Sequence, residues 1–144
     1  MKITPRIEAK VRASFARQTM MATLGAQLLD LGHGSARIAA PILPGSRQQQ
    51  DAGHAGLTFA IGDSAAGYAA LTMFDEGDEI MTVEMKINLL RPALGGPRVH
   101  GGRVLEPGRR ITVVAAEVFA ETAGDRKQIA VLQGTMIPVG LSTD

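Results

Sequence analysis

The chain contains neither cysteine nor tryptophan, and its 144 residues include only one tyrosine and four phenylalanines. The absence of cysteine excludes disulfide bonds and thiolate chemistry. With so few aromatic rings, the sequence offers no stacking platform for nucleic-acid bases. We therefore expect a core built from aliphatic side chains.

The chain has almost no excess of positive or negative charge. Fifteen Lys and Arg residues oppose fourteen Asp and Glu residues, and the basic residues are scattered, which argues against a nucleic-acid surface. The three histidines are widely spaced and form no metal-ligand pattern. No apolar run reaches the length of a membrane span, and the first residues lack the apolar segment of a signal peptide. We expect a soluble, cytoplasmic protein that binds neither nucleic acid nor membrane.

The length suits one domain with its own hydrophobic core, and we expect that domain to span residues 1–144. Thr4 and Pro5 are a favourable N-cap and first helical residue, and apolar residues follow at helical spacing. This predicts a helix over about residues 5–21. A stretch rich in Ala, Ile and Leu predicts a second, largely buried helix from about Ala55 to Phe74.

Other segments alternate apolar and polar residues between Gly- and Pro-rich turns, which is typical of β-strands. The predicted strands are Ala26 to Asp30, Ser35 to Ile42, Met81 to Leu89, Val99 to Leu105, Ile111 to Glu121 and Gln128 to Pro138. In the third of these, the odd-numbered apolar side chains are expected on one face. We expect the last four strands to form a meander. An antiparallel sheet must cover its apolar face, and the long apolar helix is the obvious cover. The prediction is an α+β fold with a sheet wrapped around that helix.

Asp63 is the one carboxylate within the apolar stretch from Leu57 to Leu71. A buried acid is costly to desolvate unless it has a partner or a function. The simplest interpretation is a tolerated Asp in a helix, and the alternative is a functional carboxylate.

The spacing around this acid carries a resemblance. Gln48 lies six positions before His54, and Asp63 lies nine positions after it. This arrangement resembles the signature of the hotdog-fold thioesterases of the phenylacetate-pathway type. In that family an amide residue precedes a His-Gly-Gly and an acid follows it. Ala55 stands here in place of the first of those glycines.

Two later stretches, Thr82 to Ala93 and Gly102 to Arg110, are also similar to the family, and the resemblance covers about residues 20 to 138. It implies a hotdog fold, an acyl-CoA substrate and hydrolysis of the thioester to a free acid and CoA. It also implies a homodimer or a dimer-of-dimers homotetramer. No cofactor is expected, since coenzyme A is part of the substrate.

A helix N-terminus can stabilise the negative charge that a thioester oxygen gains in the reaction. We expect the backbone amides near Ala55 and Gly56 to polarise the carbonyl. Gln48 either completes that site or is a solvated turn residue. His54 either caps the helix or acts as a base, and capping is the more usual role at a helix entry.

Asp63 is expected to act as the nucleophile or as the general base that activates water. If the helix begins near Ala55, eight residues place Asp63 about 12 Å along the axis from that amide. One carbonyl cannot contact both groups of the same helix. The prediction is therefore an antiparallel homodimer with two sites across the interface.

Coenzyme A is a polyanion, so cations are expected where its phosphates bind. Arg91, Arg109 and Arg110 stand where the resemblance places such contacts, although each could be a solvated surface charge.

Four further residues are expected to contact the substrate. The resemblance places Thr82 in the substrate site, and Gly67, one turn beyond Asp63, leaves room for an acyl group or for a close helix crossing. Gln49 and Leu90 complete the predicted set. The aliphatic and Met-rich lining suits short, medium and aryl acyl groups alike.

Two other functions remain possible at this stage. A hotdog hydratase or dehydratase usually pairs its Asp with a His, yet no His follows Asp63 within helical reach. A non-catalytic acyl-CoA-binding module normally carries a DNA-binding segment, and residues 1–24 are too short to form one. Hydrolysis is favoured because an ionisable residue stands at the catalytic position.

Overall fold

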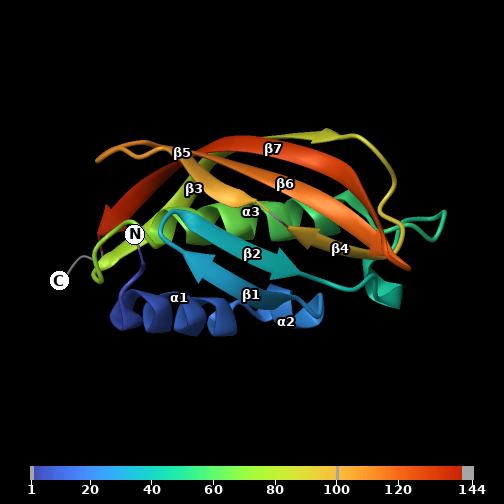
Figure 1. Ribbon diagram of the computed structural model, residues 1–144, viewed down its shortest axis with the longest axis horizontal. Helices are drawn as coiled ribbons and strands as arrows, with labels where there is room; N and C mark the ends of the chain where they lie inside the picture. Colours follow the sequence, from blue (N-terminus) through green and yellow to red (C-terminus); the bar gives the residue numbers. More distant parts are fainter. Residues whose placement is uncertain (1, 100, 141–144) are drawn as a thin grey trace.

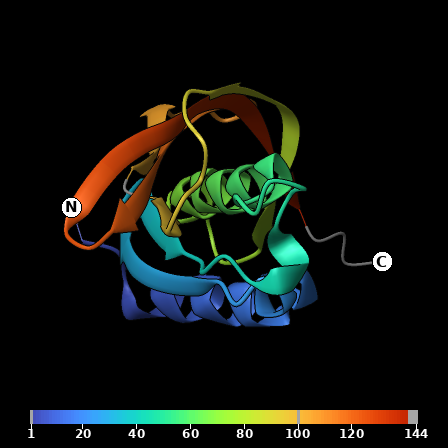
Figure 2. The same ribbon diagram turned by 90° about the vertical axis from the view of Figure 1, so that its right-hand side faces the viewer.

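The computed structural model describes residues 2–99 and 101–140. A curved sheet wraps around one long helix, and shorter N-terminal helices lie alongside the first strand at the edge of the sheet (Figures 1 and 2). The helices are α1 (Pro5–Arg17), α2 (Thr19–Thr23) and α3 (Ala55–Leu71), with a 3-10 turn at Pro44–Ser46. The strands are β1 (Gln27–Gly32), β2 (Ser35–Ala39), β3 (Asp78–Leu89), β4 (Gly96–Val99), β5 (Gly102–Glu106), β6 (Thr112–Thr122) and β7 (Asp125–Gly140).

The N-terminal helix starts as predicted but is interrupted. Thr4 caps α1 by accepting a hydrogen bond from the Ile7 amide at 3.2 Å. The prediction of one continuous helix over residues 5–21 is wrong at Gln18, whose extended backbone (φ −77°, ψ 94°) separates α1 from α2. The side chain of Gln18 donates a hydrogen bond to the hydroxyl of Tyr68, so a tertiary contact holds the break in place.

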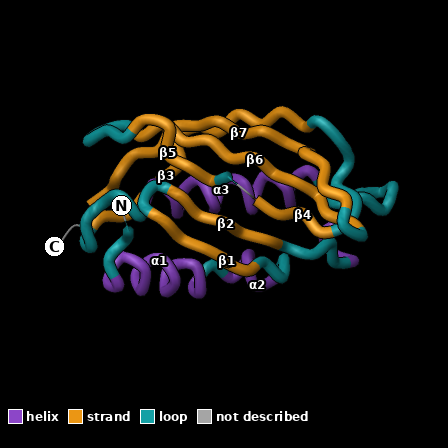
Figure 3. The backbone as a smooth tube through the Cα atoms, viewed as in Figure 1, coloured by secondary structure: helices purple, strands orange, loops and turns teal. Residues whose placement is uncertain are grey.

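Among the described residues, seven antiparallel strands form one sheet in the order β1-β2-β4-β6-β7-β3, and β5 follows β4 between β2 and β6. The predicted strand from Val99 to Leu105 is therefore two strands, and His100 within it lies outside the described residues. The predicted meander is wrong for β3, which pairs with β7 at the edge of the sheet. β1 and β3 are thus the two edge strands of a sheet that curves around α3 (Figure 3).

A β-bulge in β3 changes which side chains face the helix. Thr82 pairs with Met136 and Glu84 pairs with Thr135, so Val83 has no partner in the register. The expectation that Met81 and Val83 share a face with Met85 is therefore wrong. Met81 and Val83 are more than half exposed, whereas Thr82 points towards α3.

The core lies between α3 and the inner face of the sheet. Leu57, Ile61, Ala65 and Ala69 of α3 are all at most 3 % exposed. A side chain at Gly62 would begin 2.8 Å from a methyl group of Leu132 on β7, so the helix and the sheet are in close contact here. The expected burial of the apolar helix under the sheet is confirmed.

Thr72 links the end of α3 to the turn between β1 and β2. Its buried hydroxyl accepts a hydrogen bond from the Gly34 amide at 2.8 Å and donates one to the Ala69 carbonyl at 2.7 Å. Thr72→Val keeps the shape but leaves those groups without their partner. We expect the free energy of unfolding, measured by urea denaturation, to fall by about 1–3 kcal/mol.

The matched control is Thr23→Val, because the Thr23 hydroxyl bonds a carbonyl at the exposed end of α2. We expect a change within about 0.5 kcal/mol there. An equal loss in both variants would contradict the structural role given to Thr72.

Candidate active site

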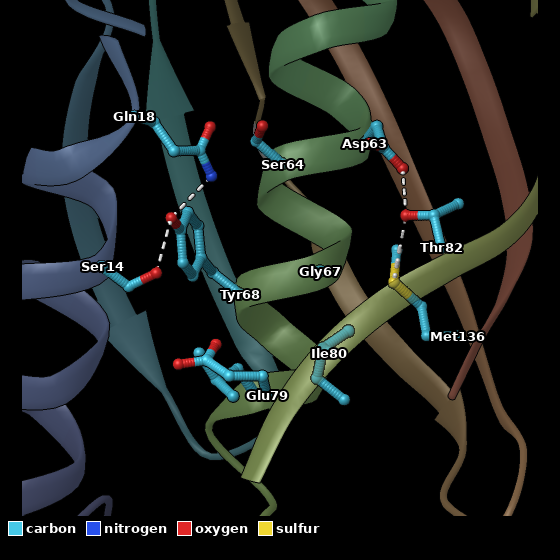
Figure 4. A pocket seen from close by; sticks show the side chains of 11 residues that line it. Ser14, Gln18, Asp63, Ser64, Gly67, Tyr68, Glu79, Ile80, Thr82 and Met136 are labelled. Atoms are coloured by element: carbon cyan, nitrogen blue, oxygen red, sulfur yellow. Dashed lines mark hydrogen bonds between the residues drawn. The ribbon is translucent and has the colours of Figure 1, made fainter. Parts of the chain in front are cut away.

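Asp63 lies midway along α3, where the helix faces β3. It is half-buried, and its Oδ1 accepts a hydrogen bond from the Thr82 hydroxyl at 2.9 Å (Figure 4). Burial raises the pKa of Asp63 above the ordinary value, and the hydrogen bond from Thr82 opposes that rise. The carboxylate is thus accessible, oriented, and a stronger base than an exposed Asp.

A cavity of about 160 Å³ opens beside this carboxylate, between α1, α3 and β3. Its lining residues are Ser14, Gln18, Asp63, Ser64, Gly67, Tyr68, Leu71, Glu79, Ile80, Thr82 and Met136. Figure 4 shows Asp63 and Thr82 at one end and Tyr68, Ser14 and Glu79 towards the other. Three predicted site residues, Asp63, Gly67 and Thr82, therefore share one cavity.

Several residues of this cavity are missing from the prediction. The Tyr68 hydroxyl accepts a hydrogen bond from the Gln18 side chain at 2.6 Å and shares one with Ser14 at 3.2 Å. Burial is the main cause that raises the pKa of Tyr68, and the nearby charge of Glu79 adds to it. The available signals were the single tyrosine in an apolar helix and the helical spacing of Ser14 and Gln18. Nothing in the sequence indicated that this face of α1 would meet α3.

The N-terminus of α3 is capped by His54. The backbone of His54 is extended (φ −63°, ψ 144°), and its Nδ1 accepts a hydrogen bond from the Gly56 amide at 2.7 Å. The capping interpretation of His54 is confirmed. The Ala55 amide donates to no acceptor among the described residues, and Ala55 is exposed. This helix end therefore offers one free amide to a ligand.

The loop before α3 is held by its own hydrogen bonds. The side-chain oxygen of Gln48 accepts a hydrogen bond from the Gln50 amide, and the Gln48 amide donates to the Ala52 carbonyl at 2.9 Å. Gln48 is half-buried, whereas Gln49 is exposed. The Gly53 amide donates to the Ala93 carbonyl at 2.9 Å, which joins this loop to the segment that follows β3.

The remaining candidates lie away from Asp63. Leu90 and Arg91 follow the end of β3, and Arg91 Nη1 donates a hydrogen bond to the Gln128 carbonyl at 2.9 Å. Arg109 and Arg110 are exposed in the turn between β5 and β6.

Arg109 lines a separate groove of about 350 Å³ that also contains Asp75 and Asp78, beyond the C-terminal end of α3. Within one chain the predicted residues thus lie in four places: the helix start with its loop, the Asp63 cavity, the segment that follows β3, and this turn. Eight residues of α3 separate Asp63 from Ala55, or about 12 Å along the helix axis.

Within residues 2–99 and 101–140, no group of three His, Cys, Asp or Glu side chains is arranged to hold a metal ion. None of the helices in the same residues is long and apolar enough to cross a membrane.

The chain is similar to two curated proteins of Saccharolobus solfataricus, each named "Putative esterase". The first is 33% identical over 94 residues, which are 65% of this chain and 66% of that protein. The second is 39% identical over 66 residues, which are 46% of this chain and 43% of that protein. The chain thus spans just under two thirds of the first relative and less than half of the second.

Solved structures give broader coverage. A thioesterase family protein from Silicibacter pomeroyi is 38% identical, with a TM-score of 0.87 over 93% of this chain and 98% of that one. The PaaI protein from the phenylacetic acid degradation operon of E. coli is 17% identical, with a TM-score of 0.82 over 96% and 97%. The latter likeness concerns the fold alone, and the expected hotdog fold is confirmed.

A family model described as the thioesterase superfamily matches residues 53–126. This match covers more than half of the chain and includes the capped helix start, Asp63 and Thr82. The chain therefore belongs to the thioesterase superfamily.

Proposed function

We propose that the protein is an acyl-CoA thioesterase that releases a free acid and CoA, with Asp63 as its reactive carboxylate. One observation carries the proposal: the only charged side chain of α3 is half-buried at the wall of a cavity, held by the Thr82 hydroxyl. Membership of the thioesterase superfamily makes a thioester the natural substrate. A cytoplasmic location remains a prediction.

Asp63 acts in one of two ways. As a nucleophile, its carboxylate oxygen attacks the thioester carbon, the carbon–sulfur bond breaks, and water then hydrolyses the resulting anhydride. As a general base, it takes a proton from water while the water oxygen attacks the same carbon. Either way the thiolate of CoA leaves and is protonated. In the first case the proton comes from solvent, and in the second Asp63 can return it.

The developing oxyanion needs a donor, and the free Ala55 amide is the candidate. The positive end of the α3 dipole strengthens that donor. Because Ala55 and Asp63 of one chain lie about 12 Å apart along the helix, the amide must come from a second copy. Gln48, on the loop before this helix start, is proposed to orient the carbonyl.

A surface for that second copy is available along β3. β3 ends the sheet among the described residues, and its exposed backbone groups can pair with another strand. Met81, Val83 and Leu89 on this strand are each more than half exposed, and Leu90 follows them. An exposed apolar edge strand is a ready interface, so we propose a homodimer, with a dimer-of-dimers tetramer as a further possibility.

The remaining predicted residues are proposed to contact the substrate. We propose that Arg109 and Arg110, which are exposed, bind the phosphates of CoA, with Arg91 as a third candidate cation. Gln49 and Leu90 are proposed to contact the substrate near the helix start.

Asp63→Asn is expected to lower kcat for acyl-CoA hydrolysis at least about a hundredfold, because an amide neither ionises nor attacks the thioester. The same variant is expected to be more stable than the wild type at neutral pH. Burial raises the pKa of Asp63, so the folded state loses stability as the pH rises through that raised value. The gain in Tm should disappear below the ordinary pKa range of Asp.

The control is Asp125→Asn, which neutralises an exposed carboxylate beside Lys127. It should change neither kcat nor Tm measurably. Full activity of the Asp63 variant would remove this residue from the reaction.

Ala55→Pro tests the shared site. Proline is compatible with the first helical position and with the extended backbone of His54 before it. The substitution should therefore keep the helix and remove the amide hydrogen that is proposed as the oxyanion donor. Ala55→Pro and Asp63→Asn should each be inactive alone. When they are co-expressed with separate affinity tags and purified through both, each mixed dimer contains one intact site of two, and its activity should be about half of the wild type.

Size-exclusion chromatography with light scattering provides the control that each variant remains dimeric. If purified mixed dimers show no recovery, the two residues do not act across subunits.

Arg109→Ala combined with Arg110→Ala is expected to raise KM for CoA thioesters about tenfold, because charge-assisted contacts to the phosphates are lost. Thioesters of pantetheine lack the nucleotide phosphates, so their KM should not change. The control pair Arg6→Ala and Arg12→Ala removes the same charge from the surface of α1. An equal loss with pantetheine thioesters would refute the phosphate contact.

A further inference from the structure

The end of the cavity away from Asp63 contains hydrogen-bonding groups that the protein does not fully use. The Tyr68 hydroxyl accepts a hydrogen bond from the Gln18 side chain and shares a single one with the Ser14 hydroxyl. Each of these two hydroxyl groups has one hydrogen to donate, and the bond between them uses only one of the two. One hydroxyl hydrogen therefore has no acceptor among the described residues and can be donated to a ligand.

Glu79 supplies an unused acceptor at the same end. Its carboxylate lines the cavity and lies near enough to Tyr68 for its charge to raise the pKa of the phenol. No described side chain forms a hydrogen bond or an ion pair with Glu79. Figure 4 shows its carboxylate below the Tyr68 ring, on the side that faces α1. The far end thus offers both a donor and an acceptor.

The length of the cavity defines what can reach these groups. Tyr68 follows Asp63 by five residues of one helix, which is about 7.5 Å along its axis and about 140° around it, so the cavity curves past Gly67. A cavity of about 150 Å³ accommodates one benzene molecule, and this one measures about 160 Å³. This volume suits an acyl group of about six carbon atoms whose end lies towards Tyr68 and Glu79.

We propose that this far end selects acyl groups that terminate in a hydroxyl, with Glu79 and Tyr68 as the specificity-determining residues. The inference rests on the proposed thioesterase function and adds the class of acyl group. A terminal hydroxyl donates to Glu79 and accepts the spare hydrogen of the Tyr68–Ser14 pair, which no methyl group can do. An alkyl end leaves these groups unpaired, and a carboxylate end meets the negative charge of Glu79 and cannot donate to it.

The test uses three CoA thioesters of matched length: hexanoyl, omega-hydroxyhexanoyl and adipoyl. For the wild type, kcat/KM should be about tenfold higher for the hydroxyl-terminated group than for hexanoyl, and lowest for adipoyl. Glu79→Gln should reduce the hydroxyl preference several-fold and raise adipoyl relative to hexanoyl. Tyr68→Phe should reduce the hydroxyl preference as well. A folding defect would lower all three rates together and leave their ratios unchanged.

The matched control is Glu76→Gln, because Glu76 is an exposed carboxylate that pairs on the surface with Arg6 at 3.5 Å. Its three rates should equal those of the wild type. Unchanged ratios in Glu79→Gln, or a wild type without a hydroxyl preference, would overturn the inference while Asp63-dependent hydrolysis of hexanoyl-CoA still stood. If no thioester is hydrolysed, the proposed function and this inference are both refuted.

Discussion

The burial of α3 is the constraint on which the rest of the molecule depends. This helix presents apolar residues on every side, so no single layer can cover it. The sheet covers the helix by curling around it, with β3 at one edge beside β7. The one charged side chain of the helix then lies where this covering is incomplete, next to a cavity. The position of the candidate site follows from how the helix is covered, because a carboxylate can remain ionised only where the wall opens.

Helix geometry then separates the two groups that the proposed chemistry needs. The free amide at the start of α3 and the carboxylate in its middle belong to one rigid element, so no flexing of that element can bring them together. His54 already occupies the neighbouring Gly56 amide, which leaves the Ala55 amide as the available donor. The long edge strand with its exposed apolar residues gives the same chain a surface for a second copy. The proposed reaction therefore depends on the contact between two subunits.

Local irregularities adjust the environment of Asp63. The bulge at Val83 shifts the alternation of β3 by one residue, so Thr82 reaches the carboxylate. The break at Gln18 lets the end of α1 approach α3, where Gln18 and Ser14 bond the Tyr68 hydroxyl. Both features interrupt regular structure, and both place polar groups around the cavity. The regular parts of the fold supply the frame, and its irregular parts determine the polarity of the site.

Short-range patterns in the sequence were enough to predict the fold class, the buried helix with its single acid, and the cap at His54, because periodicity, composition and capping act over a few residues. It also indicated Asp63, Gly67 and Thr82, which the structure places in one cavity. It did not determine the pairing of β3 with β7, the bulge at Val83 or the contact of α1 with Tyr68. Those features depend on contacts between residues far apart in the chain, because strand order and helix docking follow from which apolar faces pack together. A local pattern of residues does not specify these long-range contacts.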